Sequence, residues 1–171
     1  MVSISDFAYN LLRGTIPEEW DSTRLQFIGS VLLNRLSGEI PKGLGNISSL
    51  TYLNLEGNQF SGAIPPNIGK LRNLKTLILS SNQLGGSLPL SFSNLTNLND
   101  FRINDNKLSG IIPDLIQNWR QLIKLEMLAS ELDGPIPLNI SLLDMLQDLS
   151  YYKCTSAGCL VRKHVERASH A

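Results

Sequence analysis

A repeat of 24 residues runs through most of this chain and limits the folds that it can adopt. Asn34, Asn58 and Asn82 stand 24 residues apart, each in the same frame of leucines, a glycine and a proline. In the segment LTYLNLEGNQFSGAIP, leucines precede Asn58 by eight, five and three residues, and Gly62 and Pro65 follow it. Repetition at a fixed period of this length is typical of a stacked solenoid, in which each unit contacts only its neighbours.

The frame recurs with few departures. The in-phase polar residues are Asn10, Asn34, Asn58, Asn82, Asn106 and Ser130, the glycines are Gly14, Gly38, Gly62, Gly86, Gly110 and Gly134, and the prolines are Pro17, Pro41, Pro65, Pro89, Pro113 and Pro137. The first unit begins in mid-repeat, and between Pro17 and Val31 the phase slips by one residue. Gly29 is the residue that compensates for this slip, which predicts a local bulge.

Each unit is expected to form a short strand, a turn and a return arm. Around Leu53 and Leu55 alternate side chains point the same way, so the leucines pack inward while Tyr52 and Asn54 face solvent. Stacked units bury their leucines together behind a parallel sheet. The amide of the in-phase asparagine can donate and accept hydrogen bonds with main-chain groups of a buried turn. We therefore predict a structural ladder of Asn10, Asn34, Asn58, Asn82 and Asn106.

The consensus L-x-x-L-x-L-x-x-N-x-L-S-G-x-I-P is nearly complete in LTYLNLEGNQFSGAIP and LNDFRINDNKLSGIIP. It resembles the plant-type leucine-rich repeat of the ectodomains of plant receptor-like serine/threonine kinases. The segment FRINDNKLSGIIPDLIQNWRQLIKLEM resembles, more narrowly, the kinases that carry a malectin-like domain between the repeats and the membrane. The resemblance implies an α/β-type solenoid with a parallel concave β-sheet, irregular or 3-10 convex arms, a right-handed superhelix, and an extra short strand at S-G-x-I-P.

The same resemblance implies a function. It predicts recognition of an extracellular peptide, protein or glycan ligand, with a co-receptor ectodomain as a further partner, on the outer side of the plasma membrane. Residues 1–149 are expected to form the solenoid of six repeats, and residues 150–171 a degenerate seventh repeat with a poorly ordered basic tail. Because no N-terminal cap, signal peptide or membrane span is visible, we expect a piece of a larger protein or a truncated product.

Composition and motifs argue against several other functions. The formal net charge is zero, which gives no electrostatic basis for binding nucleic acid or a membrane surface. Catalytic carboxylates could come from Asp100, Glu126 and Asp148, which face outward. However, the predicted register sets Lys124 beside both aspartates and Arg102 beside Glu126, so charge pairing across strands is the simpler interpretation. We predict no enzyme activity, cofactor or metal.

The concave face is therefore the predicted binding surface. Tyrosine and arginine are favoured anchors at protein interfaces. The predicted contact residues are Tyr52, Asn54, Glu56, Ile78, Arg102, Lys124 and Glu126, with Tyr152, Leu32, Leu33 and Leu128 as further outward positions. The hypothesis is a peptide or co-receptor that lies across the strands from Tyr52 to Lys124.

Other features fall on the return arms. Asn46, Asn94 and Asn139 head N-x-[ST] sequons, so they are candidate N-glycosylation sites if the chain is secreted. Sugars at these positions would leave the concave face clear. Trp20 and Trp119 are expected to pack against the core.

The only two cysteines, Cys154 and Cys159, fall where the repeat pattern fades. With His164 and His170 they supply four zinc-ligand types, but the spacing differs from that of zinc fingers. A Cys154–Cys159 disulfide that closes the solenoid and a pair of free thiols in a poorly ordered end are the other interpretations.

Two further functional hypotheses stay open besides the receptor. One is a soluble cell-wall inhibitor or defence protein built from the same repeats. The other is a truncated gene product without an independent function.

Overall fold

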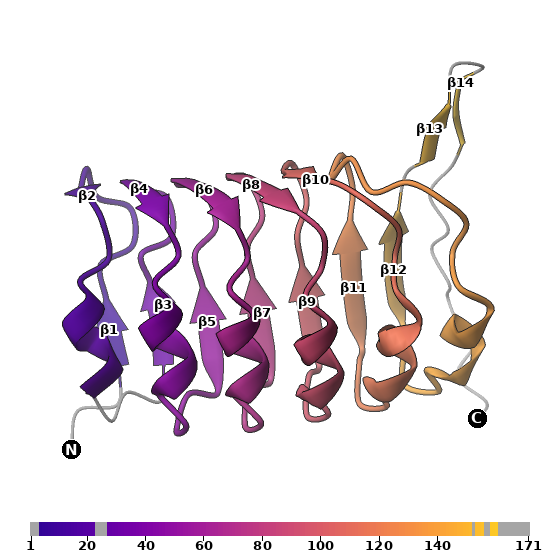
Figure 1. Cartoon of the computed structure of the whole chain (residues 1–171), viewed down its shortest axis with the longest axis horizontal. Coiled ribbons are helices and arrows are strands. Elements are labelled where there is room, and N and C mark those ends of the chain that lie inside the picture. The colour runs from indigo at the N-terminus through magenta and orange to yellow at the C-terminus, as the bar shows by residue number, and fades with distance from the viewer. Residues whose placement is uncertain (1–3, 23–26, 152, 156–157, 161–171) are drawn as a thin grey trace.

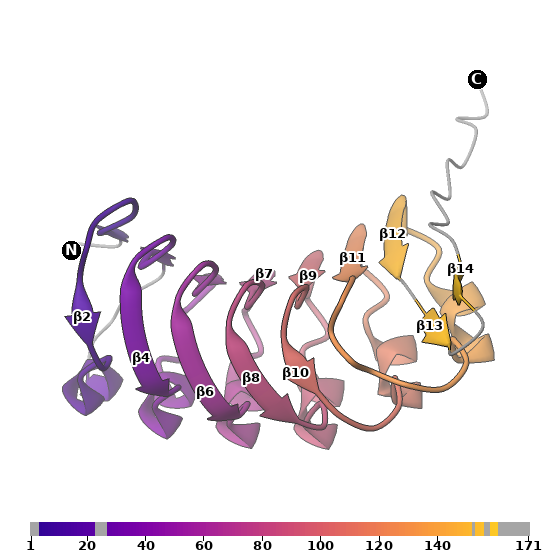
Figure 2. The ribbon, with the colours of Figure 1, turned by 90° about the horizontal axis from the view of Figure 1, so that it is seen from above.

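The computed structural model describes residues 4–22, 27–151, 153–155 and 158–160. Repeated units of strand, second strand and 3-10 helix stack side by side along the long axis of the molecule (Figure 1). Seen from above, the stack is an arc with the larger sheet on its inner side and the 3-10 helices on its outer side (Figure 2). The predicted leucine-rich solenoid is therefore confirmed.

The larger sheet has seven parallel strands in sequence order. They are β1 (Ile4–Asp6), β3 (Phe27–Ser30), β5 (Tyr52–Asn54), β7 (Thr76–Ile78), β9 (Asp100–Arg102), β11 (Lys124–Met127) and β12 (Asp148–Tyr151). From β5 onward each residue pairs with the residue 24 positions later, as Tyr52 does with Thr76. Because this offset equals the repeat length, equivalent side chains form straight rows across the sheet.

A second, parallel sheet of five strands lies beside the first, at the segment where the resemblance implied an extra strand. Its strands are β2 (Arg13–Gly14), β4 (Arg35–Glu39), β6 (Gln59–Ala63), β8 (Gln83–Gly86) and β10 (Lys107–Leu108). Here the offset is 22 residues, as in the pairs of Ser37 with Gln59 and Ser61 with Gln83. A stagger of two residues keeps the inward side chains inward, because strand side chains alternate with a period of two.

The convex side is made of 3-10 helices, as the prediction of irregular or 3-10 arms requires. They are η1 (Glu18–Ser22), η2 (Lys42–Asn46), η3 (Pro66–Lys70), η4 (Leu90–Asn94), η5 (Asp114–Asn118) and η6 (Leu138–Leu142). In each of η2 to η6 the in-phase proline directly precedes the helix. Pro41 and Pro89, for example, have an extended conformation. Proline fixes φ and so ends the preceding extended arm at the same place in each repeat.

One continuous apolar core fills the space between the sheets and the helices. The apolar residues that stand eight, five and three positions before Asn58, Asn82 and Asn106 are buried, as Leu53 and Leu55 illustrate. Trp119 is fully buried, contacts Phe101 at a ring-centroid distance of 5.1 Å, and donates its indole N–H to the Phe92 carbonyl at 2.9 Å. Trp20 is partly buried against the same core. Both tryptophans therefore pack in the way that the sequence indicates.

The in-phase asparagines link consecutive repeats. Asn58 Oδ1 accepts from the Leu36 N–H at 3.1 Å, while Nδ2 donates to the carbonyls of Val31 at 2.6 Å and Leu55 at 3.2 Å. Asn34, Asn82 and Asn106 make the equivalent bonds. Among the described residues, Asn10 donates to the Phe7 and Ala8 carbonyls of its own repeat. Each buried amide thus satisfies main-chain groups of two neighbouring turns.

Ser130 occupies the same position in the sixth repeat but bonds differently. Its hydroxyl donates to the Met127 carbonyl at 2.9 Å, within its own repeat. In the other repeats, the equivalent N–H donates to the Oδ1 atom of the asparagine. Here the Leu108 N–H donates instead to the Ser130 main-chain carbonyl at 3.0 Å. The shorter side chain is therefore replaced by a direct backbone contact between the repeats.

The phase slip in the second repeat appears as an irregular strand pairing. Ser5 pairs with Ile28 and Asp6 with Ser30, so Gly29 is skipped between β1 and β3. Gly29 is thus the inserted residue that the sequence identified, and it forms a bulge.

After β12 the chain leaves the repeat geometry. β13 (Lys153–Thr155) and β14 (Gly158–Leu160) form a two-stranded antiparallel sheet in which Cys154 is the Cα partner of Cys159. The leucine frame predicts a degenerate seventh turn at this place, with Cys154 on the asparagine position. These two strands pair antiparallel with each other, unlike the parallel strands of the two larger sheets.

Candidate functional site

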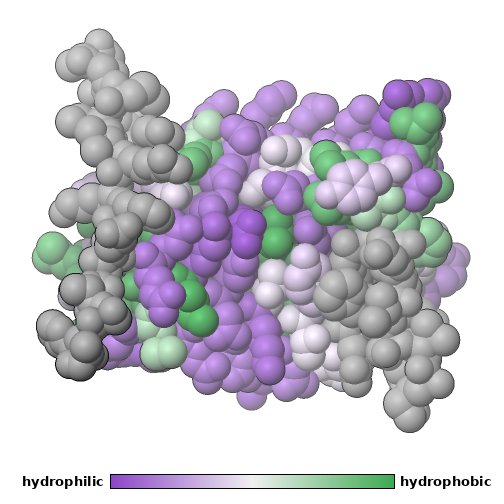
Figure 3. Space-filling view, turned by 180° about the vertical axis from the view of Figure 1, so that it is seen from behind, coloured by the Kyte–Doolittle hydropathy of each residue, from purple (hydrophilic) through white to green (hydrophobic). Residues whose placement is uncertain are grey.

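The outward positions of the seven-stranded sheet form the face that we name the concave face. Figure 3 shows this face as largely hydrophilic in its centre, with scattered hydrophobic positions. The first row contains Tyr52, Thr76, Asp100, Lys124 and Asp148, and the second contains Asn54, Ile78, Arg102, Glu126 and Ser150. These rows have the register that the repeat predicts, because each strand is paired without stagger.

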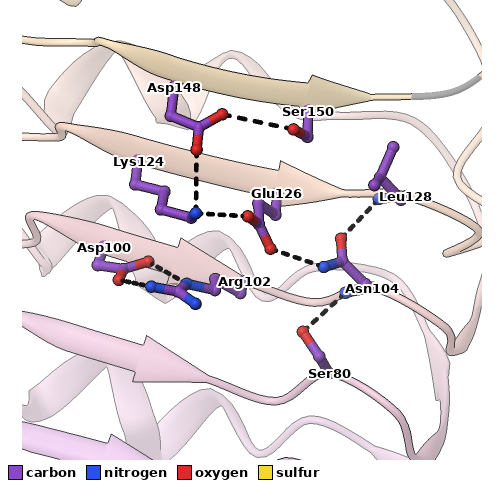
Figure 4. Close-up of polar contacts among 9 residues, drawn as sticks. All are labelled: Ser80, Asp100, Arg102, Asn104, Lys124, Glu126, Leu128, Asp148 and Ser150. Carbon is purple, nitrogen blue, oxygen red and sulfur yellow. Dashed lines mark hydrogen bonds and ion pairs between the residues drawn. The ribbon is translucent and has the colours of Figure 1, made fainter. Parts of the chain in front are cut away.

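Ion pairs connect the charged residues of this face (Figure 4). Arg102 donates two hydrogen bonds to Asp100, from Nε at 2.9 Å and from an Nη atom at 2.6 Å. Lys124 Nζ lies 2.7 Å from a carboxylate oxygen of Glu126 and 2.9 Å from one of Asp148. Only the pair of Lys124 with Asp148 joins neighbouring strands as predicted. Arg102 turns along its own strand to Asp100 instead of crossing to Glu126.

Asn104 extends this network, and the sequence prediction omitted it. Its Nδ2 donates to the second carboxylate oxygen of Glu126 at 2.8 Å, and its Oδ1 accepts from the Leu128 N–H at 2.8 Å. Its main-chain N–H donates to the Ser80 hydroxyl at 3.1 Å. The sequence could have indicated this role. Asn104 occupies the third outward position of its repeat, where a side-chain amide can reach the neighbouring strand.

The network shifts the pKa values of Arg102, Lys124 and Glu126 toward the charged forms. The hydrogen bond to Asp100 raises the pKa of Arg102, and the hydrogen bonds to Glu126 and Asp148 raise the pKa of Lys124. For Glu126, burial acts to raise the pKa, but the hydrogen bonds from Lys124 and Asn104 and nearby positive charge together lower it. The concave face therefore holds fixed, ionised groups at neutral pH.

Acid/base catalysis does not fit this arrangement. Asp100, Glu126 and Asp148 each bond a cation, and a general acid at neutral pH requires a raised carboxyl pKa, the opposite of the shift of Glu126. Among the described residues there is no group of three or more histidine, cysteine, aspartate and glutamate side chains that could hold a metal ion. What the arrangement offers is a preorganised pattern of charge and hydrogen-bonding groups.

The remaining predicted contact residues differ in how much surface they present. Tyr52 and Glu56 are half-buried, but Asn54 and Ile78 are each only 4% exposed. Asn54 is used internally, because its Oδ1 accepts from the Glu56 N–H at 2.9 Å and its Nδ2 donates to the Tyr52 hydroxyl at 3.4 Å. Asn54 and Ile78 thus offer little contact area to a ligand.

Of the further outward positions, Leu32 and Leu128 are half-buried and Leu33 is 47% exposed. Tyr152 lies outside the described residues. The sequon asparagines Asn46 and Asn94 are exposed at the ends of η2 and η4, and Asn139 is half-buried in η6. These 3-10 helices lie on the side of the molecule opposite the concave face (Figure 2).

The candidate sites at the C-terminal end are only partly described. The backbone pairs Cys154 with Cys159, but the side chains of both cysteines lie outside the described part of the structure. His164 and His170 lie wholly outside it. Within the described residues, no helix is both long enough and apolar enough to cross a membrane.

Known structures resemble this chain over most of its length. The Arabidopsis receptor kinase HAESA, solved with the peptide hormone IDA and the co-receptor SERK1, matches with a TM-score of 0.83 and 33% identity, covering 86% of this chain and 25% of that one. The ectodomain of the receptor kinase SOBIR1 from Arabidopsis thaliana matches with a TM-score of 0.71 and 32% identity, covering 77% of this chain and 72% of that one.

A different match is short. The WRKY transcription factor WRKY24 of Oryza sativa subsp. japonica is 90% identical over 21 residues, which are 12% of this chain and 4% of that protein. The chain thus spans only a few per cent of the curated relatives that it matches. By contrast, the family model described as a leucine-rich repeat region matches residues 30–166, well over half of the chain. The chain therefore belongs to the leucine-rich repeat family and has the repeat domain of plant receptor kinase ectodomains.

Proposed function

We propose that this chain is a non-catalytic recognition module, part of the extracellular ligand- or co-receptor-binding region of a plant receptor-like kinase. Its ligand is a peptide or protein that lies across the concave face. Support comes from HAESA, solved with a peptide hormone and a co-receptor, and from GASSHO1/SCHENGEN3, whose ectodomain was solved with CASPARIAN STRIP INTEGRITY FACTOR 2. The latter is 39% identical and covers 81% of this chain but only 17% of that one.

The observation that carries the proposal is the fixed arrangement of charged side chains on the concave face. Asp100 holds Arg102 with two hydrogen bonds, and Lys124 is held by Glu126 and Asp148. Side chains that are already ordered lose less conformational entropy on binding. Tyr52 adds an aromatic side chain of the type enriched among binding hot spots.

The test begins with a displayed library of random linear peptides, selected on the immobilised chain. Selected peptides are then titrated by calorimetry against Tyr52→Ala and Arg102→Gln, which remove one aromatic and one charged contact. Lys70→Gln, on the convex η3, is the matched control. We expect each concave variant to weaken binding by more than about tenfold, which corresponds to about 1.4 kcal/mol, and the control to leave it unchanged.

Two results would contradict the proposal. If no peptide is enriched, the ligand class is wrong. If enriched peptides bind Tyr52→Ala, Arg102→Gln and Lys70→Gln equally well, the concave face is not where they bind.

The three sequons are proposed as glycosylation sites of the same extracellular protein. Asn46 and Asn94 are exposed, and sugars on η2 and η4 would extend away from the concave face. Expression in plant cells followed by peptide N-glycosidase treatment is expected to lower the apparent mass, and Asn46→Gln and Asn94→Gln should each remove part of that change.

A gene product without an independent role is the second candidate, and the short match favours it. The match over 21 residues is to a transcription factor, whereas the structures that match most of the chain are receptor kinases. A chain assembled from parts of two genes would carry such a segment. Mass spectrometry of plant extracts distinguishes the two, because a functional receptor fragment should yield peptides from this chain and an untranslated product should yield none.

A further inference from the structure

Two arginines lie side by side on the second sheet, away from the concave face. Arg13 of β2 is the Cα partner of Arg35 of β4. Both side chains are exposed, and neither forms an ion pair with a carboxylate in the described part of the chain. Neighbouring strands are about 4.8 Å apart, so these two cationic side chains leave the sheet at adjacent positions. Like charges directly opposite each other on neighbouring strands are unfavourable, and an external anion would offset this.

The pair borders a shallow hollow of about 390 Å³. Arg13, Gly14, Arg35, Ser37 and Gln59 line it. The main chain at Gly14 has open space above it, because a Cβ built there would meet no atom within 4 Å. Ser37 and Gln59 are paired across β4 and β6, so their hydroxyl and carboxamide groups border the hollow from adjacent strands.

We propose that this hollow binds a tetrahedral oxyanion group, phosphate or sulfate. Each guanidinium presents a planar fork of N–H donors that matches a pair of oxyanion oxygens. The Gln59 amide supplies additional N–H donors. A tetrahedral group has enough oxygens to meet both forks and the amide at once, whereas a carboxylate has only two oxygens and satisfies a single fork.

The rest of the second sheet shows that the hollow is not a general product of the repeat. Equivalent steps pair Ser37 with Gln59, Ser61 with Gln83, and Gly85 with Lys107. None of these pairs brings two charges of the same sign together. The arginine pair is therefore a local feature, and it lies on a different sheet from the peptide-binding face proposed above.

The experiment titrates the whole chain with sodium sulfate or inorganic phosphate and monitors the amide chemical shifts by NMR. Chloride keeps the ionic strength constant. We expect saturable shifts at Gly14, Arg35 and Gln59. Arg35→Gln and Arg13→Gln should each weaken binding by about tenfold or more, because each removes a charged fork. Lys107→Gln, which removes an exposed cation from β10 of the same sheet, should leave the affinity unchanged.

Further measurements separate the ligand types. Inorganic phosphate takes up a second negative charge as the pH rises through neutrality, so its affinity should rise over that range, whereas the affinity of sulfate should stay constant. Arg35→Lys keeps the charge but loses the fork, and an intermediate affinity is expected. Circular dichroism checks that each variant is folded, and using both arginine variants keeps the test valid if one of them is unstable.

Three outcomes would overturn the proposal. They are non-saturable shifts, equal binding of acetate, and unchanged affinity in the folded arginine variants. Loss of peptide binding on the concave face would leave it untouched, so the two proposals fail independently.

Discussion

At the scale of single residues, the asparagine ladder gives the clearest link between sequence and stability. Asn58 is buried and bonds main-chain groups of two repeats. Asn58→Leu leaves a buried N–H and carbonyls without partners, so we expect a loss of about 1 to 3 kcal/mol in the free energy of unfolding. Denaturant titration of the variant and the parent chain measures this difference in the free energy of unfolding. Asn10→Leu is the control, because Asn10 is exposed and, among the described residues, donates to carbonyls of its own repeat, and equal losses in both variants would contradict the ladder's role.

A second residue-scale feature was not visible in the sequence. The residue before each in-phase asparagine, and before Ser130, has a positive φ, from 49° at Ala129 to 66° at Gly57, yet only Gly57 is a glycine. The glycine after the strand, such as Gly62 with φ of 77°, follows the consensus and was identified. Non-glycine residues at the first position differ in type, so no pattern in the letters marks the left-handed conformation there.

This conformation predicts a stabilising substitution. Ala129 is exposed with φ of 49°, a region that costs a non-glycine residue about 1 to 2 kcal/mol. Ala129→Gly removes that cost but adds chain entropy to the unfolded state, so we expect a net gain of roughly 0.5 to 1 kcal/mol by thermal or urea unfolding. Ala63→Gly, at an exposed position of strand β6, should instead destabilise, and a loss at both positions would be inconsistent with relief of backbone strain.

At the scale of elements, the strands β9, β11 and β12 show where sequence reasoning stopped. The repeat predicts which residues are neighbours, because the register follows from a fixed period. It does not predict which neighbour each side chain bonds. Arg102 selects Asp100 along its own strand, and Glu126 selects Lys124 and Asn104, because side-chain rotamers and competing partners decide those contacts.

The charge network predicts a dependence of stability on pH. The pKa of Glu126 is lowered in the folded chain, so its contribution is present above the ordinary value of 4.5 and is lost as the pH falls below it. The pKa of Lys124 is raised, so its contribution is present below 10.5 and is lost as the pH rises above that value. We expect Glu126→Gln to reduce stability by about 0.2 to 1 kcal/mol at pH 7 and by less at pH 3.

Urea titrations at the two pH values measure this difference. Glu131→Gln, an exposed position outside the network, is the control and should show no such pH-dependent difference from the parent chain. A Glu126→Gln effect of equal size at pH 3 and pH 7 would mean that the ionised carboxylate does not stabilise the sheet.

At the scale of the whole molecule, the repeat predicted nearly the entire path of the chain. The seven-stranded sheet, the second sheet and the convex 3-10 helices follow from the consensus and its resemblance. The antiparallel pairing of β13 with β14 was not predicted, because the repeat frame still places Cys154 and Gly158 in phase. Phase alone therefore does not determine the backbone path of this segment.

The stack also predicts how the molecule opens. Each repeat contacts only its neighbours, so terminal repeats lose fewer contacts on opening than central ones. Hydrogen exchange followed by mass spectrometry is expected to show strongest amide protection in β5, β7 and β9, and weaker protection in β12. Equal protection of all four strands would indicate a single cooperative unit and contradict this expectation.

The different offsets of the two sheets have a mechanical consequence. Pairing at 24 residues sets the strands of the larger sheet straight across the long axis, whereas pairing at 22 residues shifts each strand of the second sheet by about 7 Å relative to the next. Strands of the larger sheet are therefore in step with one another, whereas those of the second sheet are staggered. Sliding one repeat past another would strain the oblique hydrogen bonds, so the domain should behave as a stiff lever that holds a ligand at a fixed angle to whatever adjoins its ends.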